Sequence, residues 1–309
     1  MVLFDNCGRP LLNFRIAITQ RCNFRCDYCH KEGEDCSRGE CPDLEVSEIV
    51  RLARIAVGFG ISRVKLTGGE PLMRKDLCDI VTGIAAIPGL KDLSLTTNGS
   101  LLAFEAQRLR NCGLRRVNIS LPTLNGEIYH KLTDGRIENV LEGVRAAVKA
   151  GLTPVKLNMV ILSGVNVEAV PAMIEFAGKT GTILQLIELD PVNVDSMYFS
   201  TYHELLDTYE EMLTQKAVSI ETRRFMHNRR IYHLPEVTVE VVHPTENLEF
   251  CAHCTRLRVT SDGKLKTCLM RNDNLIDVIT PMRNGADDNE LRSFFIRANQ
   301  IREPFNKMA

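Results

Sequence analysis

Short apolar segments alternate with longer segments of helical periodicity along the first two thirds of the chain. Six short segments rich in β-branched and aliphatic residues are predicted to be strands, at residues 14–19, 63–67, 92–97, 116–121, 154–161 and 183–189. Five helices are predicted between them, at residues 47–59, 75–87, 103–111, 137–150 and 167–179. Strands that read as continuously apolar, each followed by a helix, indicate a parallel sheet covered by helices. A curved, incomplete barrel and a flat doubly wound sheet both fit this pattern.

The pattern changes after about residue 215. Short segments at 219–225, 230–233 and 237–242 predict antiparallel strands, and residues 289–301 predict one helix. Ser261-Asp262-Gly263 is a hairpin turn signal between two further short strands, at 258–260 and 264–267. We therefore expect two domains, an α/β domain at residues 1–215 and a smaller α+β extension at residues 216–309.

Composition narrows the function classes. Hydrophobic residues make up 44% of the 309 residues, which is ample for a sizeable core. The net charge of −1 gives no bulk attraction to nucleic acid or to an anionic membrane. No apolar stretch approaches the roughly 20 residues that span a bilayer. Residues 1–15 contain Asp5, Arg9 and Pro10 and lack the apolar core of a signal peptide. We expect a cytoplasmic protein with no nucleic-acid and no membrane partner.

The eleven cysteines are unevenly distributed. Five lie close together near the start, at Cys22, Cys26, Cys29, Cys36 and Cys41, and three lie near the other end, at Cys251, Cys254 and Cys268. Disulfides rarely persist in the cytosol, so the groups need another chemical explanation. Cys78 and Cys112 are isolated and lie in helix-like stretches, where we interpret them as small buried hydrophobic residues.

The first group has the spacing Cys22-x3-Cys26-x2-Cys29 and directly follows the first predicted strand. Three thiolates can hold three irons of a [4Fe–4S] cube and leave the fourth iron open to a small molecule. A structural zinc site is the alternative, and Cys36 or Cys41 would then supply its fourth ligand.

This spacing, with the aromatic Tyr28 before the last cysteine, resembles that of the radical S-adenosylmethionine (SAM) superfamily. Gly68-Gly69-Glu70-Pro71, after the second strand, is similar to the superfamily's GGEP element, which receives the amino group of SAM. Glycines let the backbone approach a ligand closely, and a carboxylate suits an ammonium group. Thr96 to Gly99 close the third strand, and Ser120 lies near the end of the fourth.

The second group has the spacing Cys251-x2-Cys254-x13-Cys268. A zinc ribbon with His253 as fourth ligand is the alternative here, although His253 lies between two ligands and is poorly placed to join them. The whole block includes Arg256, Arg258 and Gly263 and resembles the MoaA family, the GTP 3′,8-cyclases of molybdenum cofactor biosynthesis. The N-terminal segment Gly8-Arg9-Pro10 is also similar to that family.

The resemblance implies an incomplete (β/α)6 TIM-like barrel whose small C-terminal α+β extension carries a second [4Fe–4S] cluster. One cluster would bind SAM and reduce it to methionine and a 5′-deoxyadenosyl radical, which takes the 3′ hydrogen of GTP before the ribose carbon attacks C8 of guanine. The other cluster would anchor the purine. An external electron donor is implied, and a homodimer is one assembly open to the chain. By family match, Tyr28, Gly69 and Ser120 contact SAM, and the GTP contacts are Arg15, Lys65, Thr96, Lys156, Arg256 and Arg258.

Three departures from the family pattern stand out. Lys65 occupies a position where many relatives have Arg, which keeps the charge but loses the bidentate fork. Residues 184–190 lack the Arg and Met of many relatives, so Asp190 is a weak candidate for contacting SAM. Many bacterial relatives end in a flexible Gly-Gly tail, whereas residues 305–309 read FNKMA. Either catalysis is completed without that tail or the reaction differs.

Two other functions fit part of the sequence. A different radical SAM enzyme, such as a peptide-modifying maturase with an auxiliary cluster, shares the first motif but leaves Arg256 and Arg258 unexplained. A non-enzymatic zinc-binding module would use the same cysteines without any redox chemistry.

Overall fold

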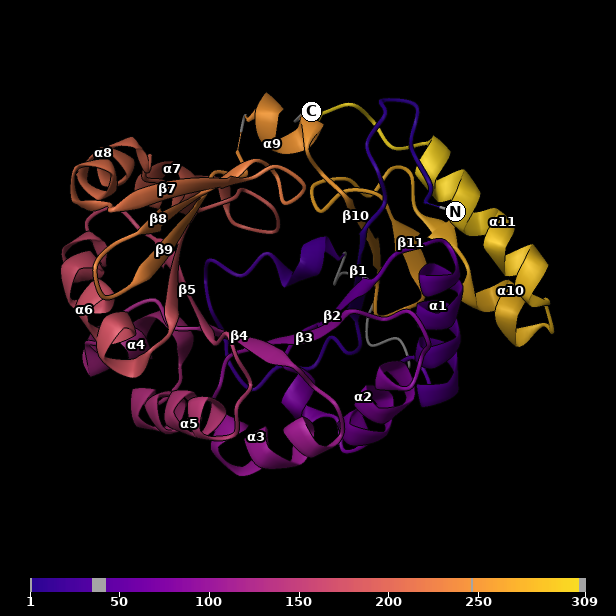
Figure 1. The fold of residues 1–309 in the computed structure, drawn as a ribbon, viewed down its shortest axis with the longest axis horizontal. Helices are drawn as coiled ribbons and strands as arrows, with labels where there is room; N and C mark the ends of the chain where they lie inside the picture. Colours follow the sequence, from indigo (N-terminus) through magenta and orange to yellow (C-terminus); the bar gives the residue numbers. More distant parts are fainter. Residues whose placement is uncertain (1, 35–42, 246, 306–309) are drawn as a thin grey trace.

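The computed structural model describes residues 2–34, 43–245 and 247–305 of the chain. Their strands form one 12-stranded sheet in the order β12-β11-β10-β1-β2-β3-β4-β5-β6-β9-β8-β7, curved around a central space (Figure 1). Six consecutive parallel strands make the middle of the sheet: β1 Asn13–Ala17, β2 Arg63–Thr67, β3 Asp92–Thr97, β4 Arg116–Ser120, β5 Lys156–Ile161 and β6 Ile183–Glu188. The predicted incomplete barrel is confirmed.

Six helices lie along the outer side of these strands (Figure 1). They are α1 Val46–Gly58, α2 Leu77–Ala85, α3 Leu102–Asn111, α4 Gly126–Thr133, α5 Ile137–Lys149 and α6 Val170–Thr180. The five predicted helices are all present, with ends shifted by a few residues. Sequence analysis missed α4, although the side chain of Asn125 caps it by accepting hydrogen bonds from the backbone N–H groups of Glu127 and Ile128, both at 3.0 Å.

The barrel strands alternate in polarity. On β2, Val64 and Leu66 are buried in the apolar core, while Arg63 and Lys65 line the interior cavity. The same alternation recurs on β1, where Arg15 lies between the buried Phe14 and Ile16. Our interpretation of these strands as continuously apolar is wrong, because only their helix-facing side is packed against apolar side chains.

The C-terminal segment extends the barrel at both ends. Strand β9 (Thr238–Val242) lies parallel to β6, and strand β10 (Arg256–Val259) lies parallel to β1. Beyond them lie the antiparallel strands β8 (Arg229–His233) and β7 (Ser219–Arg223) on one side, and β11 (Lys264–Lys266) and β12 (Ile276–Asp277) on the other. The predicted antiparallel pairs are confirmed, whereas the two parallel junctions with the barrel were not foreseen. The boundary near residue 215 stays a prediction.

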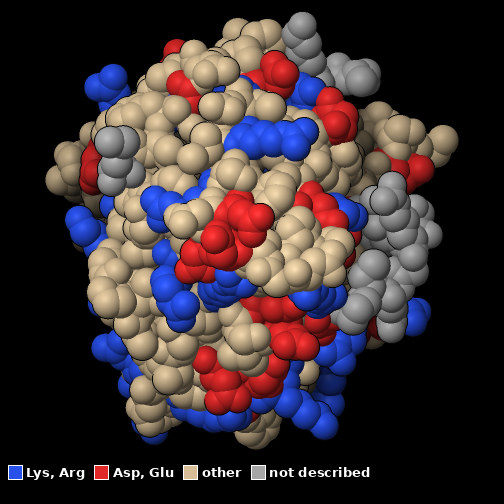
Figure 2. Space-filling model, turned by 90° about the vertical axis from the view of Figure 1, so that its right-hand side faces the viewer, with Lys and Arg blue, Asp and Glu red and all other residues tan. Residues whose placement is uncertain are grey.

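The remaining helices are α7 Ser196–Tyr202, α8 Asp207–Lys216, α9 Leu248–Ala252, α10 Ile279–Arg283 and α11 Asp288–Gln300. Helix α11 packs on the start of the barrel through Phe295, whose ring lies 5.6 Å from that of Phe14 and 6.1 Å from that of Phe59. Acidic and basic side chains are interspersed over the face shown in Figure 2. No helix within the described part of the chain is long and apolar enough to cross a membrane.

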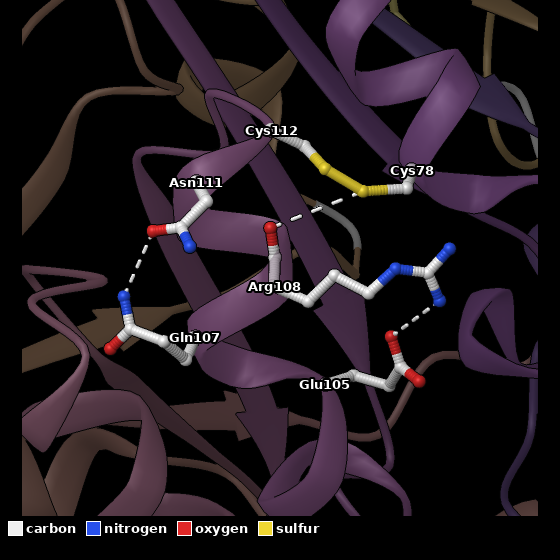
Figure 3. Close-up of a disulfide and its surroundings, with 6 residues drawn as sticks. All are labelled: Cys78, Glu105, Gln107, Arg108, Asn111 and Cys112. Atoms are coloured by element: carbon white, nitrogen blue, oxygen red, sulfur yellow. Dashed lines mark hydrogen bonds and ion pairs between the residues drawn. A yellow bond between two sulfur atoms is a disulfide. The ribbon is translucent and has the colours of Figure 1, made fainter.

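Two cysteines that we interpreted as isolated hydrophobic residues form a disulfide. Cys78 on α2 and Cys112, which follows the last residue of α3, are bonded with their Cα atoms 5.9 Å apart (Figure 3). The earlier interpretation is corrected because successive strand–helix units place α2 and α3 side by side, which the helical pattern of each segment does not reveal. Cys36 and Cys41 lie outside the described residues.

Replacing Cys112 by Ser is expected to lower thermal stability, because the disulfide closes a loop with a sequence separation of 34 residues. Chain-entropy reasoning gives such a cross-link a contribution of roughly 3–4 kcal/mol. Thermal unfolding of the wild type and of Cys112→Ser measures this, with Cys7→Ser, which removes an exposed free thiol, as the matched control. Alkylation of Cys78 and Cys112 in the unreduced wild-type protein would contradict the prediction.

Candidate active site

A cavity of about 350 Å³ in the barrel interior brings the two cysteine groups together. Cys22, Cys26 and Cys29 line it together with Cys251, Cys254 and Cys268. The predicted SAM and GTP contacts and the weak candidate Asp190 also line this cavity: Arg15, Tyr28, Lys65, Gly69, Thr96, Ser120, Lys156, Asp190, Arg256 and Arg258. The structure therefore gathers the predicted set in one place, and the role of each residue stays a prediction.

The first cysteine loop follows β1 and folds back on itself. The N–H of Cys29 donates to the carbonyl of Cys26 at 3.1 Å, and Phe24 packs edge-on against Tyr129 with ring centroids 6.3 Å apart. Burial raises the pKa of Cys26 to about 12, and the proximity of Cys29 and Cys22 adds to the shift. Burial also raises the pKa of Cys22 and of Cys29. Three cysteines that line the cavity from one loop suit a bound metal cluster, which binds thiolates and releases their protons.

Two glycines let the end of β2 approach this loop. A Cβ on Gly68 would lie 2.3 Å from the carbonyl oxygen of Thr19, and one on Gly69 would lie 2.2 Å from that of Arg21. The N–H of Gly69 donates to the Thr19 carbonyl at 2.7 Å. Any side chain at either glycine would push the cysteine loop away from the barrel, which explains the residue type at both positions.

The position of the Glu70 carboxylate differs from our expectation that it would face the amino group of SAM. It is fully buried and accepts hydrogen bonds from the Leu72 N–H at 2.9 Å, the Thr97 hydroxyl at 2.7 Å and the Asn98 N–H at 2.6 Å. Burial raises its pKa to about 6, although these donors act in the opposite direction. The carboxylate thus holds the ends of β2 and β3 together, and Gly68 and Gly69 line the cavity in its place.

The second cysteine loop is held by arginines from both ends of the chain. Arg9 forms an ion pair with Asp5 at 2.7 Å and donates to the carbonyl of Cys251 at 3.0 Å, and Arg302 donates to the carbonyl of Cys254. Burial acts to raise the pKa of Cys254, but the positive charges of Arg302, Arg256 and Arg9 outweigh it and lower the pKa. A thiolate is therefore stabilised here, and Arg9 explains the Gly8-Arg9-Pro10 motif.

The ring of His253 points away from this site. Its Nδ1 lies 2.9 Å from the carbonyl oxygen of Glu249, in the preceding helical turn, and His253 is not among the residues that line the cavity. A metal ion held jointly by His253 and the cavity thiols is not compatible with this arrangement.

Three cationic side chains lie in register on adjacent parallel strands. Arg15 on β1 is opposite Arg258 on β10 and opposite Lys65 on β2, and neighbouring strands are about 4.8 Å apart. Glu32, in the first cysteine loop, reaches two of them, with its oxygens 3.3 Å from Arg15 and 2.9 Å from Arg258. Burial acts to raise the pKa of Glu32, but Arg15, His30 and Arg258 hold it well below its usual range.

A second carboxylate forms ion pairs with cations on the opposite side of the curved sheet. Glu240 on β9 accepts a hydrogen bond from Lys156 on β5 and another from Arg223 on β7 at 3.2 Å. Burial lowers the pKa of Lys156 to about 8 although Glu240 favours its charged form.

Two predicted phosphate-binding residues have no such partner. Across residues 2–34, 43–245 and 247–305, no carboxylate lies within ion-pair distance of Lys65 or Arg256. Burial, together with the surrounding cations, lowers the pKa of both side chains well below the ordinary values. Both side chains are partly buried, and partly buried cations without counter-ions are costly, so the cavity favours a ligand with several negative charges.

Comparison with known proteins identifies the family. Residues 16–177 match the model of the radical SAM superfamily, and residues 182–308 match the model described as Molybdenum Cofactor Synthesis C. A relative from Thermococcus kodakarensis is 49% identical over 99% of this chain and 100% of its own length, and one from Methanocaldococcus jannaschii is 42% identical over 98% and 99%. Both are described as probable GTP 3′,8-cyclases. The chain belongs to the GTP 3′,8-cyclase family of radical SAM proteins.

Solved structures agree with this family's fold. A Streptococcus suis protein, SuiB, bound to S-adenosylmethionine, has a TM-score of 0.66 at 15% identity over 92% of this chain and 67% of that one. The protein anSMEcpe with bound AdoMet has a TM-score of 0.58 at 16% identity, over 84% and 75%. Such low identity supports the fold alone. As a member of the radical SAM superfamily, the chain uses a [4Fe–4S] cluster and SAM.

Sequence analysis missed several residues of this radical SAM site. Glu32 and Glu240 organise the cations, and Asp92 pairs with Arg116 inside the barrel at 2.5 Å. Glu240 was detectable, because an acidic residue in the middle of the strand Thr-Val-Glu-Val-Val has to meet a cation or water when that strand is buried. Glu32 carried no such signal, since its partner Arg258 lies 226 residues away.

A cluster of ionisable side chains supports the β6–β9 side of the barrel. His243, just after β9, lies 3.6 Å from a carboxylate oxygen of Glu188 and 3.5 Å from one of Glu210. The imidazole of His203 also contacts Glu188, at 2.7 Å. Burial acts to lower the pKa of His243, but the two carboxylates outweigh it and raise the pKa to about 9.

This arrangement predicts a pH-dependent contribution of His243 to stability. The folded pKa lies above the unfolded value of about 6.5, so the contribution is fully present below about pH 6.5 and is lost as the pH rises through about 9. His243→Gln should lower the free energy of unfolding on the order of 1 kcal/mol in acid and have little effect in base. Urea unfolding of both proteins at the two ends of this range measures it, and a pH-independent difference would argue against the ion pairs.

Proposed function

We propose that this chain is a radical SAM GTP 3′,8-cyclase, a lyase of molybdenum cofactor biosynthesis that acts in the cytoplasm. It converts GTP to (8S)-3′,8-cyclo-7,8-dihydroguanosine 5′-triphosphate and takes electrons from an external donor. It needs neither nucleic acid nor a membrane, and it can work as a homodimer. The observation that carries the proposal is one cavity lined by both groups of three cysteines and by Lys65 and Arg256, for which the described residues provide no carboxylate partner.

The first cysteine loop holds the cluster that binds SAM. Cys22, Cys26 and Cys29 are its ligands, and Tyr28, Gly69 and Ser120 contact SAM. When bound, this cluster and SAM supply the one-electron chemistry that generates a 5′-deoxyadenosyl radical. The chain's own part is to position the ligand: the close contact of Gly69 with Arg21 leaves room for backbone only, and buried Glu70 fixes the neighbouring strand ends.

The second cysteine loop holds an auxiliary [4Fe–4S] cluster through Cys251, Cys254 and Cys268. The positive charges that lower the pKa of Cys254 favour ligand thiolates and offset the negative charge that they bring. With only three protein ligands, such a cluster would keep one iron available to the purine, and the loop that holds it would then set the orientation of the base.

The cations bind and orient the triphosphate. Arg15, Arg256 and Arg258 offer forked donors that match phosphate oxygens, while Lys65 and Lys156 act as point charges and Thr96 as a hydroxyl donor. Glu32 and Glu240 hold some of these side chains in place before the ligand arrives. A highly charged nucleotide supplies the missing negative charge.

The peptide-modifying alternative accounts for less of the structure. A complex of SuiB with the precursor peptide SuiA has a TM-score of 0.65 with this chain at 16% identity over 92% of it and 67% of SuiB, which supports a shared fold. A neutral peptide would leave the partly buried charges of Lys65 and Arg256 uncompensated, and this favours a polyanionic substrate. The zinc-module alternative leaves the same charges without a function.

Product analysis tests the proposal directly. Anaerobically purified, reduced protein incubated with SAM and GTP should form 5′-deoxyadenosine and a GTP isomer with a bond between C3′ and C8. GTP deuterated at C3′ should transfer its deuterium to 5′-deoxyadenosine, which mass spectrometry detects. Formation of 5′-deoxyadenosine without deuterium, with GTP recovered unchanged, would contradict the proposal.

Cysteine variants are expected to separate the two clusters. The wild type should hold about eight irons, with about four lost in each variant. Cys26→Ala should abolish reductive cleavage of SAM, whereas Cys254→Ala should keep some uncoupled cleavage and lose the product made from GTP. Iron content and both reaction products are measured for each variant. Equal loss of SAM cleavage in both, with the other cluster intact, would contradict this division.

A further inference from the structure

The hairpin β7–β8 reaches the cavity from the edge of the sheet. Its last paired residues before the turn are Arg223 and Arg229, and both line the cavity. The turn is fixed on the second cysteine loop, because His227 stacks on Phe250 at 3.9 Å and its N–H donates to the carbonyl of His253 at 3.2 Å. The tip of the hairpin is therefore a part of the wall beside the second cluster site.

Arg229 is a cavity-lining cation of this hairpin for which the described residues provide no counter-ion. Its Nε is buried without a hydrogen-bond partner, and among the residues that the structure describes no carboxylate lies within ion-pair distance of its guanidinium. Its two neighbours on the hairpin differ. Arg223 pairs with Glu240 at 3.2 Å, and the exposed Arg230 lies 3.8 Å from Glu210 on the opposite side of the strand.

The surroundings of Arg229 are mostly positive. Burial lowers its pKa to about 10, Glu240 partly offsets the shift, and Arg15 and Arg223 add to it. Arg15 and Arg256, two of the predicted phosphate contacts, line the same cavity as Arg229. A single polyanion in the cavity can compensate all three charges.

We propose that Arg229 is a further substrate-binding residue, whose guanidinium donates hydrogen bonds to the triphosphate of the nucleotide. The proposal rests on the proposed function and adds the β7–β8 hairpin to the nucleotide site. A guanidinium presents its donors in a planar fork that matches two phosphate oxygens, and the partnerless Nε is one of those donors. Binding of the triphosphate removes the cost of burying this charge alone.

An alternative role for Arg229 is that of a counter-ion to the second cluster, because the nearby Cys254 favours the charged form of Arg229. The two roles predict different losses of ligand affinity when Arg229 is replaced. A phosphate ligand matters for GTP and not for guanosine, which lacks phosphates. A counter-ion to the cluster would affect the cluster's reduction potential and would affect both ligands alike.

The experiment compares Arg229→Gln, Arg229→Lys and the matched control Arg230→Gln in the anaerobic holoenzyme. Equilibrium binding of GTP, GDP and guanosine is measured, together with iron content and the reduction potential of the second cluster. Arg229→Gln should weaken GTP binding by about tenfold or more, as expected for a charge-assisted hydrogen bond. Guanosine binding and the reduction potential should be unchanged, Arg229→Lys should recover part of the loss, and Arg230→Gln should bind GTP like the wild type.

Unchanged GTP affinity in Arg229→Gln with full iron content would overturn the inference. Equal weakening of GTP and guanosine, or a shifted reduction potential with intact GTP affinity, would overturn it in favour of the counter-ion role. Failure of the proposed function is recognised separately, because the wild type would then show no binding preference for GTP over guanosine and would form no product.

Discussion

Like charges in register on neighbouring parallel strands are the constraint on which the rest of this structure depends. Arg258, Arg15 and Lys65 lie side by side across β10, β1 and β2 and line the cavity of the barrel. Strand spacing is fixed by backbone hydrogen bonds, so these side chains cannot separate by moving the strands. Glu32 offsets part of this repulsion by pairing with Arg15 and Arg258. The remaining positive charge must be compensated by the ligand.

Glu32 connects this constraint to the cluster chemistry. It lies three residues after Cys29, in a left-handed backbone conformation with φ of 52°, and it contacts two cations of the barrel interior. The loop that carries the first three thiols is thereby attached to the strand pair β1–β10, and β10 begins directly after the second cysteine loop. The two thiol groups and the cations between them consequently form one charge-coupled unit.

Much of the fold was predictable because its signals are local. Strands β2 and β3 were predicted to the residue, since glycine, asparagine and polar residues end each apolar run there. Helix α4 was missed because it has only eight residues, fewer than three turns of apolar periodicity. The polarity of the barrel interior was misread for a different reason. Single polar residues between large aliphatic ones scarcely lower the hydrophobicity of a short strand, yet they occupy one whole face of it.

The site was predictable where residues follow strand ends, and not where partners come from distant segments. Tyr28 lies in the loop after β1, Gly69 follows the end of β2, and Ser120 ends β4. A parallel barrel brings these carboxyl-terminal strand ends together. The contacts of Glu32, Glu240 and Arg229 depend on which loop crosses which strand. Tertiary packing determines this, and no local sequence pattern indicates it. The same limit explains why the disulfide between Cys78 and Cys112 was not predicted, because predicting it requires knowing how α2 faces α3.

The position of β9 and β10 has a consequence for synthesis of the chain. Strands β1 and β6, the two ends of the barrel arc, each acquire their outer neighbour only from residues beyond 237. While a ribosome is still producing that segment, both edges expose unpaired backbone groups that can associate with other chains. The nascent protein therefore depends on its last quarter to close two vulnerable edges at once. Shielding by chaperones, and delivery of iron only after release, would match this order of assembly.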